Sequence, residues 1–68
     1  DHAGQNETSI MLTLRSDLVD MTQLPQDPSI SPERILGKDP RHATVNIGKK
    51  YLDAAIRIIQ QKLTAAGL

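Results

Sequence analysis

The segment from residue 40 to residue 66 carries an amphipathic pattern that constrains the fold more than any other feature. At about 100° per residue, its apolar side chains form two neighbouring stripes that together cover more than half of a helix circumference. The first stripe comprises Val45, Gly48, Leu52, Ile56, Ile59 and Leu63, and the second comprises Ile47, Tyr51, Ala54 and Ile58. The pattern predicts one long helix over residues 40–66, ending at Gly67, that packs against more than one surface, such as a sheet and a neighbouring helix or subunit. Gly48 costs this helix about 1 kcal/mol relative to alanine, which indicates the close approach of another backbone.

The remaining residues predict one short helix and a connecting segment. Residues 8–19 place apolar side chains at helical spacing, and Asn6 or Thr8 can cap that helix. Residues 20–38 contain Pro25, Pro28 and Pro32, which block long helices and remove donors from central strands. We expect 20–38 to be irregular, with one helical turn at residues 31–34.

The amino-acid composition limits the cellular compartment and the classes of partner that we expect for this chain. The chain has 68 residues, no cysteine and a single aromatic side chain, so disulfides are excluded and a large core is not expected. Acidic and basic side chains balance at eight each, and no basic cluster carries aromatics, which argues against nucleic-acid binding. No apolar run approaches the roughly 20 residues of a membrane span. We expect a soluble, cytoplasmic protein that binds no membrane, since the absence of cysteine fits a reducing compartment.

The first nine residues hold the polar side chains that suggest chemistry. Their sequence is Asp1-His2-Ala3-Gly4-Gln5-Asn6-Glu7-Thr8-Ser9, and it leads into an apolar helix. A loop with acids and an imidazole before a helix is typical of a catalytic loop, so we interpret the chain as the C-terminal piece of an enzyme. Without further context, a lone histidine is more often a surface residue, and Glu7, Thr8 and Ser9 more often cap the helix.

Two segments of the chain resemble the creatininase (creatinine amidohydrolase) family. The first is His2-Ala3-Gly4-x-x-Glu7-Thr8-Ser9 followed by Leu12-x-Leu14-Arg15-x-x-Leu18-Val19. The second is Asp39-Pro40-Arg41-His42-Ala43-Thr44-x-x-x-Gly48-x-x-Tyr51-Leu52. Together they span most of this chain, but only the C-terminal part of a typical family member.

The resemblance implies an α/β fold class. The chain would be the mainly helical C-terminal segment of a three-layer α/β/α, creatininase-like domain and not an autonomous domain. Within that domain, residues 1–9 would be the active-site loop, 8–19 a short helix, 20–38 the connection and 40–66 the long helix. The implied partners are the missing N-terminal part of the same fold, a small-molecule amide substrate and further copies in a homo-oligomer such as a hexamer.

The resemblance also implies an activity and a role for each loop residue. The activity is hydrolysis of a non-peptide or cyclic amide C–N bond by a water bound to two divalent metal ions, zinc, manganese or iron. His2 matches the catalytic histidine, which passes a proton from that water to the leaving nitrogen, and imidazoles titrate near neutral pH as this requires. Asp1 takes the position that faces the substrate. Glu7 is assigned to catalysis by orienting the loop, and metal ligation is the alternative.

Two features depart from the family pattern. Gln5 stands where the family often has glutamate, which removes a charge near the site and leaves the substrate class open. The motifs Glu-x-His and Asn-Gly-His, which supply most of the family's metal ligands, do not occur, so we expect the other ligands outside this chain.

Two other hypotheses stay open at this point. The chain is alternatively a small helical interaction module that docks through its amphipathic C-terminal helix, with a coincidental N-terminal motif. The third hypothesis is a truncated chain without activity. A docking module has no need for His2, Gly4 and Glu7 at their observed spacing, which favours the enzyme.

Overall fold

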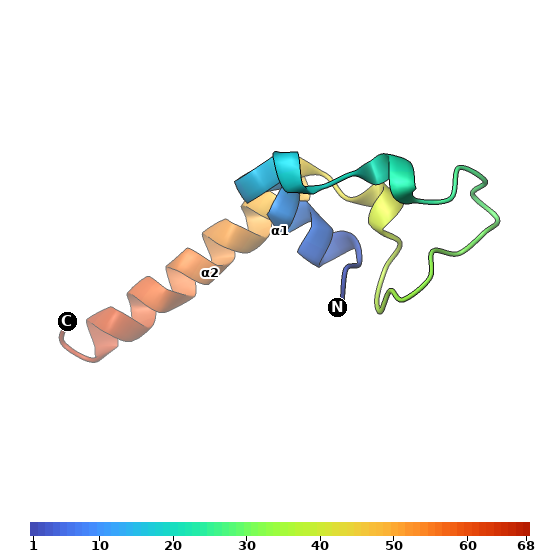
Figure 1. The fold of residues 1–68 in the computed structure, drawn as a ribbon. Helices are drawn as coiled ribbons and strands as arrows, with labels where there is room; N and C mark the ends of the chain where they lie inside the picture. Colours follow the sequence, from blue (N-terminus) through green and yellow to red (C-terminus); the bar gives the residue numbers. More distant parts are fainter.

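The computed structural model describes all residues from 1 to 68, and they form two helices joined by a long irregular segment (Figure 1). Helix α1 comprises Gln5–Arg15 and helix α2 comprises Val45–Ala65. Three short 3-10 turns accompany them, at Ser16–Leu18, Met21–Gln23 and Pro40–His42. Helix α1 packs against the first turns of α2, and the rest of α2 extends away from the body of the molecule, which measures 51 × 22 × 16 Å overall.

The expected α/β fold class is wrong for this chain, which is a hairpin-like pair of helices without a strand. Its only β feature is an isolated antiparallel bridge between His2 and Leu36. The physical reason lies in the irregular segment, where Pro25, Pro28 and Pro32 each lack the N–H group that a ladder of strands requires. The sheet was implied by family resemblance alone, and no run of residues in this chain builds one.

The beginning of α1 also differs from the prediction. The helix begins at Gln5 instead of residue 8 and ends at Arg15 instead of residue 19, and neither Asn6 nor Thr8 caps it. The Asp1 carboxylate accepts hydrogen bonds from the first turn instead. Residues 31–34 contain no helix, so the expected helical turn there is also wrong.

Helix α2 begins at Val45 instead of residue 40, because residues 40–42 form a separate 3-10 turn. Both of its ends follow from local sequence chemistry. Thr44 caps the first turn, because its Oγ1 accepts a hydrogen bond from the Ile47 N–H at 3.1 Å. At the other end Gly67 adopts a φ of +78°, which glycine tolerates without a steric penalty. This turn lets the Leu68 N–H donate to the Leu63 carbonyl at 2.9 Å, so the last turn keeps its hydrogen bonds.

The two helices meet where Gly48 faces α1. Gly48 is buried, and a Cβ atom at this position would lie closer than 3.0 Å to the Ser9 carbonyl oxygen and the Thr13 Oγ1. Polar side chains of α1 join the start of α2: the Ser9 Oγ accepts from the Thr44 N–H at 3.0 Å, and the Thr13 Oγ1 donates to the Val45 carbonyl at 3.1 Å. The prediction that Gly48 marks a close backbone approach is confirmed.

Arg41 fixes the start of the irregular segment. Its guanidinium donates to the Asp39 carboxylate and to the carbonyl oxygens of Pro25 and Asp27, the latter two at 3.1 and 3.0 Å. The hydrogen bonds from Arg41 hold the pKa of the Asp39 carboxyl below its usual value, so this pair stays charged at neutral pH. Arg41 therefore joins the beginning of the segment, at Pro25 and Asp27, to its end at Asp39, and the residues between them form the large open loop in Figure 1.

Apart from the ring of Pro40, no apolar side chain is buried. The only buried residues are Gly4, Ser9, Pro40 and Gly48, and all residues of α2 after Leu52 are exposed. The accessible surface is 5409 Å², whereas a compact monomer of this mass has about 4,200 Å². The wide apolar face predicted for the long helix is thus present and largely uncovered. Neither helix combines the length and apolarity that a membrane span requires.

Candidate functional site

The prediction of a loop over residues 1–9 is wrong for its second half, because α1 begins at Gln5 and only residues 1–4 precede it. Asp1 attaches this short segment to the N-terminus of α1. The Asp1 carboxylate accepts hydrogen bonds from the backbone N–H groups of Asn6 at 3.0 Å and Glu7 at 3.2 Å. These are among the N–H groups that a helix cannot satisfy internally, and a negative charge is favourable at this end. Asp1 therefore acts as a cap that reaches across the loop. Its predicted contact with a substrate stays a prediction.

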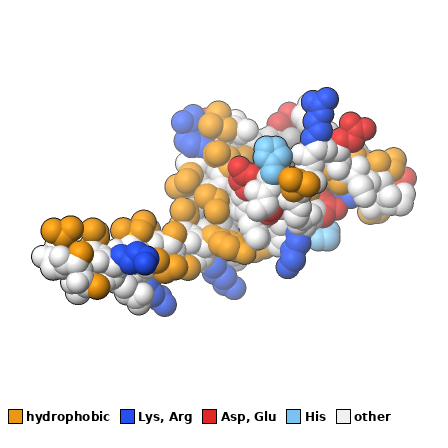
Figure 2. Space-filling view, turned by 90° about the horizontal axis from the view of Figure 1, so that it is seen from below, with side chains coloured by type: hydrophobic (Ala, Val, Ile, Leu, Met, Phe, Trp, Pro, Cys, Tyr) orange, Lys and Arg blue, Asp and Glu red, His pale blue; other side chains and the backbone are white.

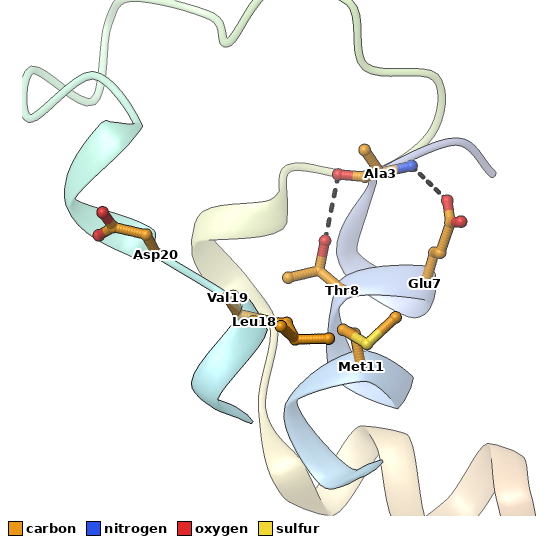
Figure 3. A pocket seen from close by; sticks show the side chains of 7 residues that line it. All are labelled: Ala3, Glu7, Thr8, Met11, Leu18, Val19 and Asp20. Atoms are coloured by element: carbon orange, nitrogen blue, oxygen red, sulfur yellow. Dashed lines mark hydrogen bonds between the residues drawn. The ribbon is translucent and has the colours of Figure 1, made fainter. Parts of the chain in front are cut away.

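Glu7 and Thr8 hold the Ala3 peptide from both sides. The Ala3 N–H donates to the Glu7 Oε2 at 2.5 Å, and the Thr8 Oγ1 donates to the Ala3 carbonyl at 3.2 Å (Figure 3). Ala3 has a φ of +52°, a left-handed conformation that is unfavourable for alanine unless its surroundings hold it. An orienting role for Glu7 requires this kind of hydrogen bond. Metal ligation by Glu7 stays a prediction.

His2 lies between these anchors, and its backbone pairs with Leu36. The His2 N–H donates to the Leu36 carbonyl at 2.8 Å, and the Leu36 N–H donates to the His2 carbonyl at 3.0 Å. The His2 side chain is exposed and makes no hydrogen bond within the chain. The loop therefore fixes the backbone of His2 and leaves its imidazole free to meet a ligand.

The end of the irregular segment forms the other wall of the loop. The Gln5 N–H donates to the Lys38 carbonyl at 2.9 Å. Gly37 has a φ of +114°, and a Cβ there would lie closer than 3.0 Å to Asp1, so only glycine lets this segment approach. Gly4 is similarly enclosed between the Asp1 carboxylate and the Lys38 carbonyl. Sequence reasoning missed residues 36–38 as part of the site, and Gly37 was the one local signal available.

A shallow pocket of about 300 Å³ adjoins the N-terminal segment, since Ala3, Glu7 and Thr8 are among its lining residues. Figure 3 shows Met11 and Leu18 pointing toward one another within it, while Glu7 turns toward Ala3. Asp20 lines its far end, but this carboxylate accepts hydrogen bonds from Thr22, which lower its pKa. Glu7 and Asp20 already accept hydrogen bonds, and His2 does not line the pocket. The pocket therefore offers a ligand mainly its apolar side chains.

The residues present do not make a metal site by themselves. No group of three or more histidine, cysteine, aspartate or glutamate side chains is close enough to hold a metal ion. Glu7 gives one carboxylate, and its Oε2 already accepts from Ala3. His42 ends the 3-10 turn Pro40–His42 and is exposed. A single carboxylate is far short of the donor set of a divalent metal, so these residues cannot hold a metal ion by themselves.

Comparison with known proteins adds no relative. No family model matches this chain, and neither a curated protein nor a solved structure matches it.

Proposed function

We propose that the N-terminal segment Asp1–Glu7 supplies the proton-transfer group of a metal-dependent amidohydrolase that cleaves a small or cyclic amide. The observation that supports this most is the difference between the two acids of this segment and its histidine. Asp1 and Glu7 bind backbone N–H groups, whereas the His2 imidazole is exposed and unpaired on a fixed backbone. A proton-transfer group needs this combination of fixed position and free nitrogen atoms.

In this proposal His2 performs the proton transfers at the scissile bond. One imidazole nitrogen accepts the proton from the attacking water, and the protonated ring then donates to the nitrogen that leaves. Residues outside 1–68 would hold the two metal ions, zinc, manganese or iron, and the ions would supply a water that loses its proton near neutral pH. The remaining partners of the proposal are a small-molecule amide and further copies in a homo-oligomer in the cytoplasm.

Glu7 variants of the complete protein, with its metals bound, test this proposal. We expect Glu7→Gln to retain both metals and most activity, because the amide oxygen still accepts from the Ala3 N–H. Glu7→Ala should retain both metals and lose roughly 10- to 100-fold in rate, a loss typical of removing an orienting partner. Metal analysis beside steady-state hydrolysis of cyclic amides such as creatinine and hydantoin measures both quantities.

Glu33→Gln is the matched control, because Glu33 is an exposed acid of the irregular segment. It should match the wild type in rate and metal content. Loss of one metal in Glu7→Gln would instead identify Glu7 as a ligand. A wild-type protein that hydrolyses no cyclic amide in the presence of zinc, manganese or iron would refute the proposed function.

A second candidate function rests on the exposed apolar face of α2. Figure 2 shows apolar side chains gathered along the extended arm, with lysine and arginine between them. Ile56, Ile58, Ile59 and Leu63 remain 46 to 57% exposed. Monomeric proteins rarely leave so large an apolar face in water, and such faces mark interaction sites. In this reading the chain is a helical module that docks through α2.

We expect the 68-residue chain to self-associate as its concentration rises, because association is the available way to cover α2. Ile59→Glu should shift the association to higher concentration, since it places a charge in the apolar face. Gln60→Glu adds the same charge on the polar arc and should behave as the wild type. Sedimentation equilibrium measures the difference. A wild-type chain that stays monomeric and melts cooperatively would show that α2 needs no cover.

A further inference from the structure

Leu36 lies in a position that neither the sequence patterns nor the proposed function explains. It is 70% exposed although it is apolar, and its backbone forms both hydrogen bonds of the bridge to His2. Residues that exchange both hydrogen bonds in an antiparallel pair lie directly opposite one another, about 5.5 Å apart between Cα atoms. Their side chains project from the same face. We therefore expect the Leu36 side chain and the His2 imidazole to lie on the same face of the bridge.

The neighbouring contacts hold Leu36 in this position. Gly37 packs against Asp1 with no room for a side chain, and the Lys38 carbonyl accepts from the Gln5 N–H. Arg41, in the 3-10 turn Pro40–His42, donates hydrogen bonds to the carbonyls of Pro25 and Asp27 at the beginning of the irregular segment. The bridge uses only backbone atoms of Leu36, so the fold needs no leucine there. The exposed isobutyl group is therefore available for a ligand.

We propose that Leu36 is a specificity-determining residue of the site that contains His2. Its side chain contacts the part of the substrate next to the scissile amide and favours an apolar substituent there. This inference rests on the proposed function, because it takes His2 as the group that meets the amide. Leucine has no polar atom to orient a substrate by hydrogen bonding, so its contribution is the removal of apolar surface from water.

The test compares two cyclic amides that differ only by an isopropyl group on the ring carbon beside the scissile bond, such as hydantoin and 5-isopropylhydantoin. In the complete protein, Leu36→Ala should lower kcat/KM for the substituted ring by roughly 10- to 100-fold, the range expected for a few lost methyl or methylene contacts. The unsubstituted ring should change by less than about threefold, since it lacks the group that Leu36 contacts. Leu36→Met conserves volume and should retain the preference.

Ile30→Ala is the matched control, because Ile30 is an exposed apolar residue of the same segment and is not the residue that forms the bridge to His2. It should change neither substrate. An equal fall in kcat for both rings in Leu36→Ala would overturn the inference, because Leu36 would then act by positioning His2. A lower melting temperature with an unchanged substrate ratio would also overturn it, since Leu36 would then pack against protein.

Failure of the proposed function gives a different result. If His2→Ala hydrolyses the rings as fast as the wild type, His2 does not meet the amide and both proposals fail. If His2→Ala is inactive while Leu36→Ala matches Ile30→Ala, only the specificity role fails. An NOE between the Leu36 methyl groups and the His2 ring measures the side-by-side placement without any assay, and its absence would contradict the geometry on which the inference depends.

Discussion

Under the proposed function, replacing His2 by alanine is expected to lower kcat of the complete protein by roughly 10² to 10⁴, the usual contribution of a general acid–base group. Metal content should stay unchanged, because the imidazole is assigned to proton transfer and not to ligation. The fold should also stay intact, since the bridge to Leu36 uses only the backbone of His2. Steady-state rates, metal analysis and circular dichroism measure these three outcomes.

His42→Ala is the control for this experiment, because His42 is the only other imidazole and is also exposed. It should retain wild-type turnover. Imidazole added to the buffer should restore part of the activity of His2→Ala, as expected when a proton-transfer group alone is lost. Near-native turnover of His2→Ala would mean that His2 is an ordinary surface residue of the loop.

The second large effect is expected for Gly48→Ala. Alanine favours a helix over glycine by about 1 kcal/mol, so α2 by itself should gain stability. The added Cβ would nevertheless lie closer than 3.0 Å to the Ser9 carbonyl oxygen and the Thr13 Oγ1, and α1 has to move away. Overpacking of this kind typically costs about 1–3 kcal/mol. We therefore expect α1 to separate from α2 in Gly48→Ala, while α2 itself stays helical.

Hydrogen exchange detects this separation directly. The Thr44 N–H, which donates to the Ser9 Oγ, should exchange about 10- to 100-fold faster in Gly48→Ala, in line with the cost of overpacking. Helix content by circular dichroism should not fall. Asn46→Ala is the control, because Asn46 is an exposed residue of the same turn and its replacement brings no contact. Unchanged exchange at Thr44 in Gly48→Ala would show that α1 and α2 do not meet at this residue.

Periodic features of this chain were predictable, whereas contacts distant in sequence were not. The long helix follows from side-chain spacing alone, and Gly48 signalled the close contact through its helix-breaking cost. Ser9 shows the limit of such reasoning. It was interpreted as a helix cap, but it joins α1 to Thr44 across 35 residues, a contact that no local rule contains.

The candidate site was predictable to a similar extent. The residues His2 and Glu7 were singled out by their local motif, but Leu36 carries no motif because a bridge between backbones leaves no mark on side-chain chemistry. The cap was also missed, since Asp1 reaches the helix only through the left-handed turn at Ala3. The α/β expectation failed for a third reason: it described a family, and these residues alone form no sheet.

Because the irregular segment is held at both ends, its middle can change in length and sequence. Arg41 holds Asp27 at one end, the bridge holds Leu36 at the other, and residues 28–34 between them are mostly exposed. Doubling the length of such a loop costs only about 0.6 kcal/mol in closure entropy. Insertions between residues 28 and 34 can therefore add a peptide epitope or a new recognition loop while the position of His2 is preserved.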